Sequence, residues 1–203
     1  MTVIVDYGVG NLFSLRSSFA AIGTEVSFSS DPKAVASADK IILPGVGAFC
    51  DASKKLKESG MQDAVLEAAG RGTPLLGVCL GMQMLFDRSF ENGEYEGLGL
   101  IKGDVIGLKD IIPEGLKIPQ IGWNALKFEK DCKLFGRINE GDYVYFVHSY
   151  AAVEMGNALA ATTEYGATVT AAVCKDNIYG CQFHPEKSGE VGLNILRAFC
   201  EDI

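Results

Sequence analysis

Residues 73–82, with the sequence TPLLGVCLGM, predict a short apolar strand that turns sharply into a helix. Gly77 and Gly81 flank Cys79, and a reactive side chain on such a turn needs small neighbours, because a Cβ there would collide with the turn or with a substrate. The turn places the Cys79 sulfur at the start of a helix, where free backbone N–H groups and the helix dipole favour a thiolate. A lone cysteine after an apolar strand is more often a buried small hydrophobe, so the interpretation as a nucleophile needs further residues.

Short apolar strands and helical periods alternate on both sides of this turn. Strands are expected at 2–6, 24–28, 40–43 and 74–78, and an amphipathic helix is expected after the first strand, with its apolar face formed by Leu12, Leu15, Phe19 and Ile22. This alternation predicts an α/β fold, a doubly wound, flavodoxin-like mixed sheet with helices on both faces. Residues 99–182 are β-rich, which predicts antiparallel pairing in the second half, and a closing helix begins at about Ser188. The length suits a single domain, 1–203.

A candidate base for Cys79 comes from the far end of the chain, in GCQFHPE (residues 180–186). A cysteine that attacks an amide needs a base that then protonates the leaving nitrogen, and the imidazole of His184 titrates in the right range. Glu186 follows across a proline that fixes one backbone angle, so its carboxylate is placed to accept a hydrogen bond from the ring. The only other histidine, His148, is an alternative base, but the Pro-Glu that follows His184 favours His184. Cys79, His184 and Glu186 therefore form a candidate triad.

A glycine-flanked turn follows the apolar run in IILPGVGA, residues 41–48. Attack on a carbonyl requires N–H donors aimed at the developing oxyanion, and a loop with little side-chain bulk lets the backbone approach closely. The backbone from Gly45 to Gly47, together with the N–H of Leu80, is the candidate oxyanion hole. Taken alone this signal is weak, because Pro-Gly after a strand is usually only a turn.

The formal charge of −8 argues against nucleic acid or an anionic membrane as a main partner. Residues 1–6 lack the basic region and apolar core of a signal peptide, and no apolar run approaches the length of a membrane span, so we expect a cytoplasmic protein. The six cysteines are scattered without CxxC spacing, which suggests neither a zinc site nor a disulfide framework. We expect no metal and no organic cofactor.

The segments GVCLGMQ (77–83), PGVG (44–47) and HPE (184–186) resemble class I glutamine amidotransferases, which hydrolyse glutamine with a Cys-His-Glu triad. Further segments resemble one branch of that family, the glutaminase subunits of imidazole glycerol phosphate synthases: DYGVGNL (6–12), IGWN (121–124), FVHSY (146–150) and FHPEKS (183–188). The resemblance covers essentially the whole chain.

The resemblance implies a heterodimer with a (β/α)8-barrel cyclase or synthase subunit, which uses the ammonia released from glutamine in histidine biosynthesis. It implies that Cys79 attacks the glutamine amide, that His184 accepts and then donates the proton, and that Glu186 orients His184. Glutamine would be held by residues Gly45, Gln83, Glu91, His148, Ser149 and Tyr150, and the oxyanion by the N–H groups of Gly47 and Leu80. It further implies that Trp123, Asn124 and Lys187 lie near the partner interface and that the isolated chain is a poor glutaminase.

Two other interpretations remain open from the sequence. The chain is a glutaminase subunit of another amidotransferase, such as the pyridoxal phosphate synthase type, although DYGVGNL and IGWN argue against that. Alternatively, it is a non-catalytic α/β protein that senses redox state through an oxidised elbow cysteine. Such a sensor needs neither the His-Pro-Glu motif nor Gln83, and release of glutamate from glutamine separates the two classes.

Overall fold

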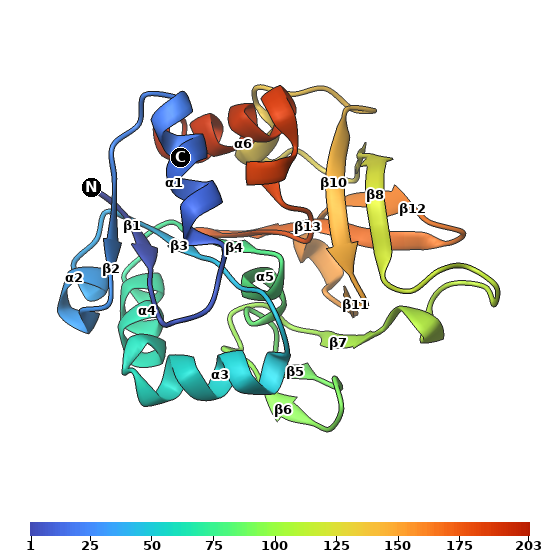
Figure 1. Cartoon of the computed structure of the whole chain (residues 1–203), viewed down its shortest axis with the longest axis horizontal. Coiled ribbons are helices and arrows are strands. Elements are labelled where there is room, and N and C mark those ends of the chain that lie inside the picture. Colours follow the sequence, from blue (N-terminus) through green and yellow to red (C-terminus); the bar gives the residue numbers. More distant parts are fainter.

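An eight-stranded mixed sheet runs through the computed structural model, which describes residues 1–203, in the order β2-β1-β3-β4-β14-β13-β12-β9 (Figure 1). Five strands pair in parallel: β1 (Thr2–Val5), β2 (Val26–Ser29), β3 (Lys40–Leu43), β4 (Leu75–Val78) and β14 (Ile178–Cys181). The sheet continues through antiparallel pairs with β13 (Thr168–Lys175), β12 (Leu159–Glu164) and β9 (Lys127–Phe128). The predicted α/β fold with a mixed sheet is confirmed. Strands β1 to β4 match the expected apolar runs to within two residues, whereas the parallel strand β14 was not among those expected.

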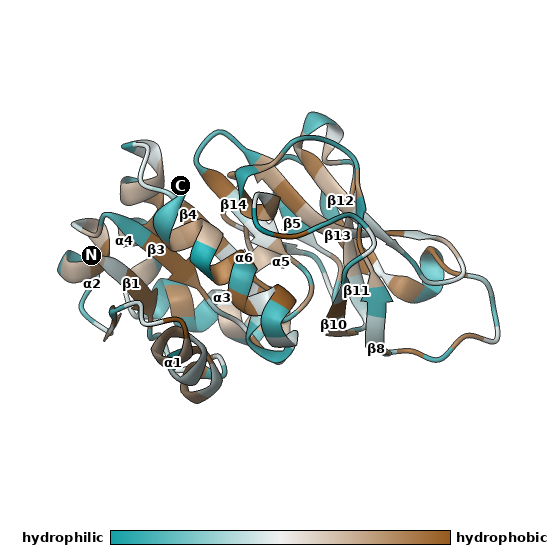
Figure 2. Ribbon diagram, turned by 90° about the horizontal axis from the view of Figure 1, so that it is seen from above, coloured by the Kyte–Doolittle hydropathy of each residue, from teal (hydrophilic) through white to brown (hydrophobic).

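Helices cover both faces of the sheet. Helices α1 (Leu12–Ala21) and α6 (Gly189–Glu201) lie on one face, and α2 (Pro32–Ala36), α3 (Phe49–Glu58), α4 (Met61–Gly70) and α5 (Leu80–Gln83) lie on the other (Figure 1). Because successive side chains of a strand point to opposite faces, Val3 and Val5 pack under α3 and α4, whereas Ile4 packs under α1 and α6. In Figure 2 strands β1 and β3 are coloured brown, which marks hydrophobic residues. The main sheet therefore has two separate hydrophobic cores, one on each face.

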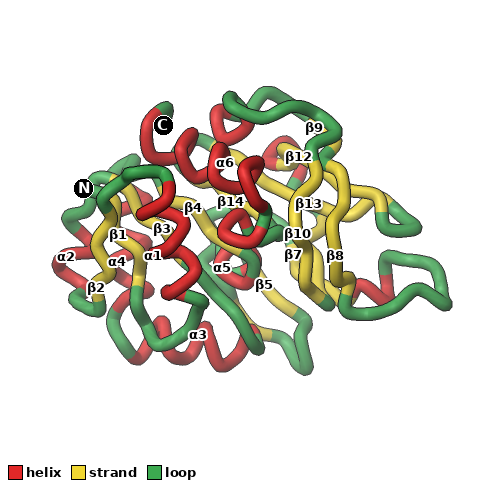
Figure 3. Tube along the Cα trace, turned by 45° about the horizontal axis from the view of Figure 1, so that its top comes forward, coloured by secondary structure: helices red, strands yellow, loops and turns green.

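Residues 88–153 add two smaller sheets to the main sheet (Figure 3). A two-stranded antiparallel ladder joins β8 (Gln120–Ala125) to β10 (Tyr143–His148). A four-stranded sheet has the order β11-β7-β5-β6, formed by Tyr150–Val153, Asp104–Gly107, Arg88–Ser89 and Tyr95–Glu96. These additions bring Glu91 and residues 147–150 next to the carboxyl end of β4, where Cys79 lies.

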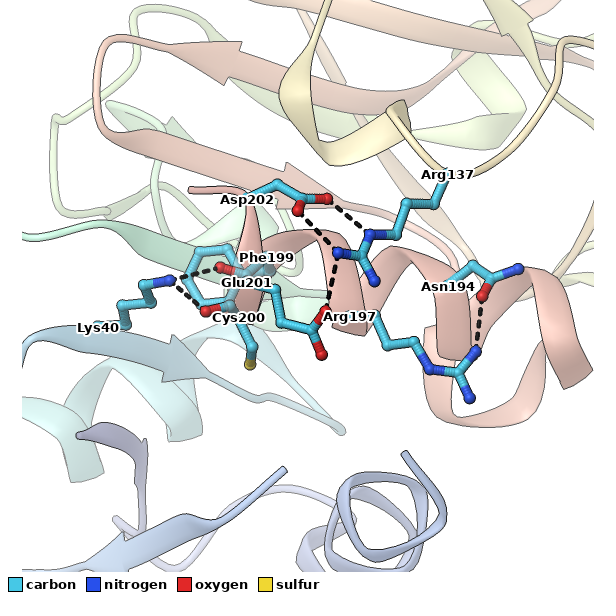
Figure 4. A network of polar contacts seen from close by, with 8 residues as sticks. All are labelled: Lys40, Arg137, Asn194, Arg197, Phe199, Cys200, Glu201 and Asp202. Carbon is cyan, nitrogen blue, oxygen red and sulfur yellow. Dashed lines mark hydrogen bonds and ion pairs between the residues drawn. The ribbon is translucent and has the colours of Figure 1, made fainter. Parts of the chain in front are cut away.

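The end of α6 is tied to the rest of the fold by charged side chains (Figure 4). The Lys40 ammonium donates to the carbonyls of Phe199, at 3.2 Å, and of Cys200, which are among the last carbonyls of the helix and lack intrahelical partners. The Arg137 guanidinium grips both oxygens of Asp202, at 2.7 and 2.8 Å. None of the helices is long and apolar enough to cross a lipid bilayer.

Candidate active site

Cys79 sits on a strained turn between β4 and α5, with φ of 55° and ψ of −111°, a conformation that side-chain-bearing residues rarely adopt. The turn is held by Cys79 N–H, which donates to the Cys181 carbonyl of β14 at 2.8 Å. A Cβ on Gly77 would lie 2.6 Å from the Gly81 carbonyl oxygen, and one on Gly81 would lie 1.9 Å from the Leu43 carbonyl oxygen. The two flanking glycines are therefore required by close backbone packing, as the sequence predicted.

His184 follows β14 and precedes a short 3₁₀ turn, Pro185–Lys187. Its Nδ1–H donates to Glu186 Oε1 at 2.8 Å, and both side chains are almost completely buried. Burial by itself lowers the pKa of His184, but the interactions with the Cys79 sulfur and the Glu186 carboxylate outweigh burial and raise the pKa to about 9. At neutral pH the imidazole is therefore protonated and lies beside the sulfur.

The other carboxylate oxygen of Glu186, Oε2, is buried and has no hydrogen-bond partner. A buried carboxylate with one free oxygen is costly unless an adjacent positive charge compensates it. The protonated His184 supplies that charge. The pair therefore stabilises the imidazolium form of the histidine.

Two glutamine side chains connect Cys79 to β11. Gln83 Nε2 donates to the Tyr150 carbonyl oxygen at 3.0 Å and to Gln182 Oε1 at 2.9 Å. Gln182 is fully buried, and its own Nε2 lies 3.7 Å from Cys79 Sγ. Gln182 was not predicted from the sequence, although the alternation of side chains along an extended segment was a usable signal: Gln182 and His184 are two residues apart and face the same side.

A cavity of about 320 Å³ opens over Cys79. It brings together ten of the residues singled out from the sequence: Gly47, Cys79, Leu80, Gln83, Glu91, His148, Ser149, Tyr150, His184 and Lys187. Glu186 lies behind His184, and Gly45 packs against the turn itself, since a Cβ on Gly45 would lie 2.7 Å from the Gly81 nitrogen. The cavity therefore collects segments from both halves of the chain around one sulfur.

Glu91 reaches the cavity and also supports the glycine turn. Its Oε2 accepts from Phe49 N–H at 2.8 Å, at the start of α3, where backbone N–H groups lack helical partners. Gly47, in the preceding turn, has φ of 89°, and a Cβ added there would have no atom within 4 Å. Gly47 is thus needed for its backbone conformation and not for lack of space.

His148 occupies the cavity wall in a form unsuited to act as a base for Cys79. Its Nδ1–H donates to the Tyr150 carbonyl oxygen at 2.8 Å, and its Nε2 lies 3.0 Å from Gln120 Oε1. Burial lowers the pKa of His148 to about 4, against the hydrogen bond with Tyr150, and the nearby charge of His184 lowers it further. At neutral pH His148 is uncharged, in contrast to His184.

The three predicted interface residues lie outside the triad. Trp123 is 51% exposed on β8, where its ring meets Tyr145 edge-on at 5.9 Å, and Lys187 Nζ lies 5.9 Å from the same Tyr145 ring. Asn124 points to the other face of β8, where it accepts from Gln120 Nε2 at 3.0 Å. The exposed face of this ladder, which we call the β8–β10 face, also carries two other large apolar side chains, Ile121 and Tyr143, that are more than half exposed.

Comparisons with known proteins match the whole chain. A family profile described as glutamine amidotransferase class-I matches residues 3–203. Imidazole glycerol phosphate synthase subunit HisH of Caldanaerobacter subterraneus subsp. tengcongensis is 48% identical over 206 residues, covering 100% of this chain and 98% of the relative. The protein of the same name from Sulfurimonas denitrificans is 50% identical over 201 residues, covering 98% of this chain and 97% of the relative.

Solved structures agree in fold. A crystal structure of a glutamine amidotransferase superposes with a TM-score of 0.76 at 20% sequence identity, over 98% of this chain and 97% of that one. The structure of PurLQS from Thermotoga maritima contains a chain that superposes with a TM-score of 0.74 at 20% identity, over 99% of this chain and 97% of that one.

Proposed function

Since the chain belongs to the class I glutamine amidotransferase family, and within it to the glutaminase subunits of imidazole glycerol phosphate synthase, we propose that Cys79, His184 and Glu186 hydrolyse glutamine as a catalytic triad. The observation that carries the proposal is the burial of the His184–Glu186 pair beside the Cys79 sulfur, at the floor of the cavity. A thiol next to an imidazolium is held as the thiolate, which is the nucleophilic form.

The reaction proceeds through a thioester. The Cys79 thiolate attacks the side-chain amide carbon of glutamine, and the carbonyl π electrons move to the oxygen. The imidazolium of His184 gives its proton to the nitrogen as the carbon–nitrogen bond breaks, and ammonia leaves. His184, now neutral, accepts a proton from water as the water oxygen attacks the thioester, and glutamate departs as the thiolate is restored. Glu186 holds the ring in the orientation that both steps need.

The cavity supplies groups for binding as well as for chemistry. We assign the backbone N–H groups of Gly47 and Leu80 to the oxyanion, because both residues line the cavity beside the sulfur. A zwitterionic substrate needs a carboxylate for its ammonium group and donors for its own carboxylate. We assign Glu91 to the first role and the backbone N–H groups around Gly45 to the second. The other residues assigned to substrate binding, Gln83, His148, Ser149 and Tyr150, form the remaining wall of the cavity.

The β8–β10 face is our proposed docking surface for the barrel synthase subunit, in a heterodimer that passes ammonia on for histidine biosynthesis. Aromatic side chains exposed together on a flat ladder are typical anchors of protein interfaces. Trp123 and Lys187 each lie near the Tyr145 ring. Lys187 also lines the cavity, so this face borders the glutaminase site. Asn124, which we also place near the interface, lies on the same strand with its side chain on the opposite face, where it accepts from Gln120.

The decisive experiment is glutamate release from glutamine by the chain alone and with a barrel synthase carrying its nucleotide ligand, with Cys79→Ala as the control. We expect weak release alone, strong stimulation by the loaded synthase and no release from the control. Full turnover without the synthase would contradict the coupling between subunits. Absence of release under both conditions would contradict the glutaminase function.

A further inference from the structure

We propose that Gln182 is a fourth catalytic residue, whose side-chain amide donates a hydrogen bond to the Cys79 sulfur and stabilises it as the thiolate. The inference deepens the proposed glutaminase function and rests on it for its catalytic meaning. Gln182 Nε2 lies 3.7 Å from Sγ, within the longer range of hydrogen bonds to sulfur, and the Gln182 side chain is fully buried. A buried amide that points at a reacting atom contacts it directly instead of acting through another residue.

The backbone fixes which end of the Gln182 amide faces the sulfur. The Tyr150 carbonyl oxygen can only accept, so it holds the nitrogen end of the Gln83 amide, which lies 3.0 Å away. The same Gln83 nitrogen lies 2.9 Å from Gln182 and donates to its oxygen. With its oxygen committed to Gln83, Gln182 presents its nitrogen to Cys79. The direction of the whole chain of hydrogen bonds is thus set by one main-chain carbonyl of β11.

A neutral donor at this position suits both halves of the reaction. In the free enzyme it stabilises the negative charge on sulfur. In the second half, the water oxygen bonds to the thioester carbon, the carbon–sulfur bond breaks, and the electron pair returns to sulfur, where the Gln182 N–H again meets a developing thiolate. An uncharged amide gives this stabilisation without forming a second ion pair that competes with His184.

The effect of Gln182 on Cys79 reactivity can be measured separately from the effects of the other groups that face Cys79. The titratable groups that interact with Cys79 are His184 and the Cys181 thiol from β14, and Glu91, His148 and Lys187 line the same cavity. Burial raises the pKa of Cys181 well above its ordinary value, so this neighbour stays uncharged. All of these residues are retained in the variants below, and a change in Cys79 reactivity therefore reports on Gln182.

The test is the pH profile of Cys79 alkylation by iodoacetamide, measured on the peptide that contains Cys79 by mass spectrometry, in the full chain and in Gln182→Met. Methionine has a similar length but no donor. We expect the pH of half-maximal alkylation to rise by about one unit, which corresponds to the loss of one charge-assisted hydrogen bond. With the loaded synthase, kcat for glutamine should fall by about tenfold while KM changes little, because the contact is strongest when sulfur carries charge.

Gln62→Met, in α4 and away from the cavity, is the matched control and should leave both readouts unchanged. Gln182→Glu keeps the shape of the side chain but replaces the donor with an acceptor, and it should raise the pH of half-maximal alkylation further. If Gln182→Met fails to fold, the Gln182→Glu profile alone tests whether the donor stabilises the thiolate. A Gln182→Met or Gln182→Glu profile that superimposes on the parent profile overturns the proposal. Because alkylation requires neither glutamine nor synthase, a shifted profile in a chain without glutaminase activity would instead contradict the proposed function alone.

Discussion

The Nδ1–H of His184 donates to Glu186 Oε1 across 2.8 Å inside the protein, with about 3% of the histidine and 2% of the glutamate side chain exposed. The contact is thus almost completely removed from water. The low exposure strengthens the electrostatic coupling, because little solvent screens it. The pair therefore sets the protonation state of the group that we assign as acid and base.

Replacing the Glu186 carboxylate with an amide of the same shape should reveal its electrostatic effect on His184. In Glu186→Gln the hydrogen-bond position is kept but the negative charge is lost, so we expect the pKa of His184 to fall from about 9 and kcat/KM for glutamine to fall by about a hundredfold or more. The alkaline limb of the pH–rate profile of the complex should move to lower pH. Glu190→Gln, on the exposed surface of α6, is the control. An unchanged alkaline limb would contradict the assigned role of Glu186.

The two histidines should make stability fall on both sides of neutral pH. The pKa of His184 is raised to about 9, so its stabilising contribution is complete below about 6.5 and is lost as the pH rises through 9. The pKa of His148 is lowered to about 4, so the unfolded chain binds a proton more readily and stability falls as the pH drops from 6.5 towards 4. Urea unfolding between pH 4 and 9 checks this.

In that series we expect the free energy of unfolding to be largest near pH 6.5. In His148→Gln it should fall less steeply as the pH drops towards 4. Carboxylates with lowered pKa values, such as Asp202 beside Arg137, add to the loss of stability at the acid end of this range and below it. Stability that is flat between pH 6.5 and 9 would contradict the environment described for His184.

Gly81 should be the least replaceable residue of the elbow. In Gly81→Ala the new Cβ would meet the Leu43 carbonyl oxygen at 1.9 Å, and backbone on both sides must move to admit it. We expect a loss of about 3 kcal/mol or more in the free energy of unfolding, measured by chemical denaturation. Gly70→Ala, where nothing lies within 4 Å of the added Cβ, is the control and should be neutral or mildly stabilising. Equal stabilities for the two variants would contradict the packing of the elbow.

Trp123 is the only tryptophan of the chain and is 51% exposed on the β8–β10 face, so its fluorescence should report docking directly. We expect a blue shift when the synthase subunit is added, because the indole leaves water. Trp123→Ala should weaken binding, measured by titration calorimetry, by about tenfold or more while leaving thermal stability nearly unchanged. Phe13→Ala removes an even more exposed aromatic ring, at 80%, and serves as the control. Unaltered affinity in Trp123→Ala would count against this docking surface.

Sequence patterns predicted strands β1 to β4 and the elbow, because those features depend on local signals: apolar runs, their spacing and the paired glycines around Cys79. The four-stranded sheet β11-β7-β5-β6 was not predicted, since β5 and β6 have two residues each and are too short to show a period. Gln182 was missed for a different reason. A polar residue in a buried segment gains its meaning from partners such as Gln83 and Tyr150, which lie far away in sequence.

Adjacent residues at the elbow belong to different cores: Cys79 packs with the residues under α1 and α6, and Leu80 packs with those under α3 and α4. The elbow therefore joins the two layers, with the nucleophile in one layer and the next residue in the other. For protein engineering this means that the layers are not independent modules. A redesign that increases or decreases the side-chain volume of one layer displaces the sulfur relative to the other layer. Attempts to stabilise the protein must therefore adjust both layers together and select for glutamine turnover at every round.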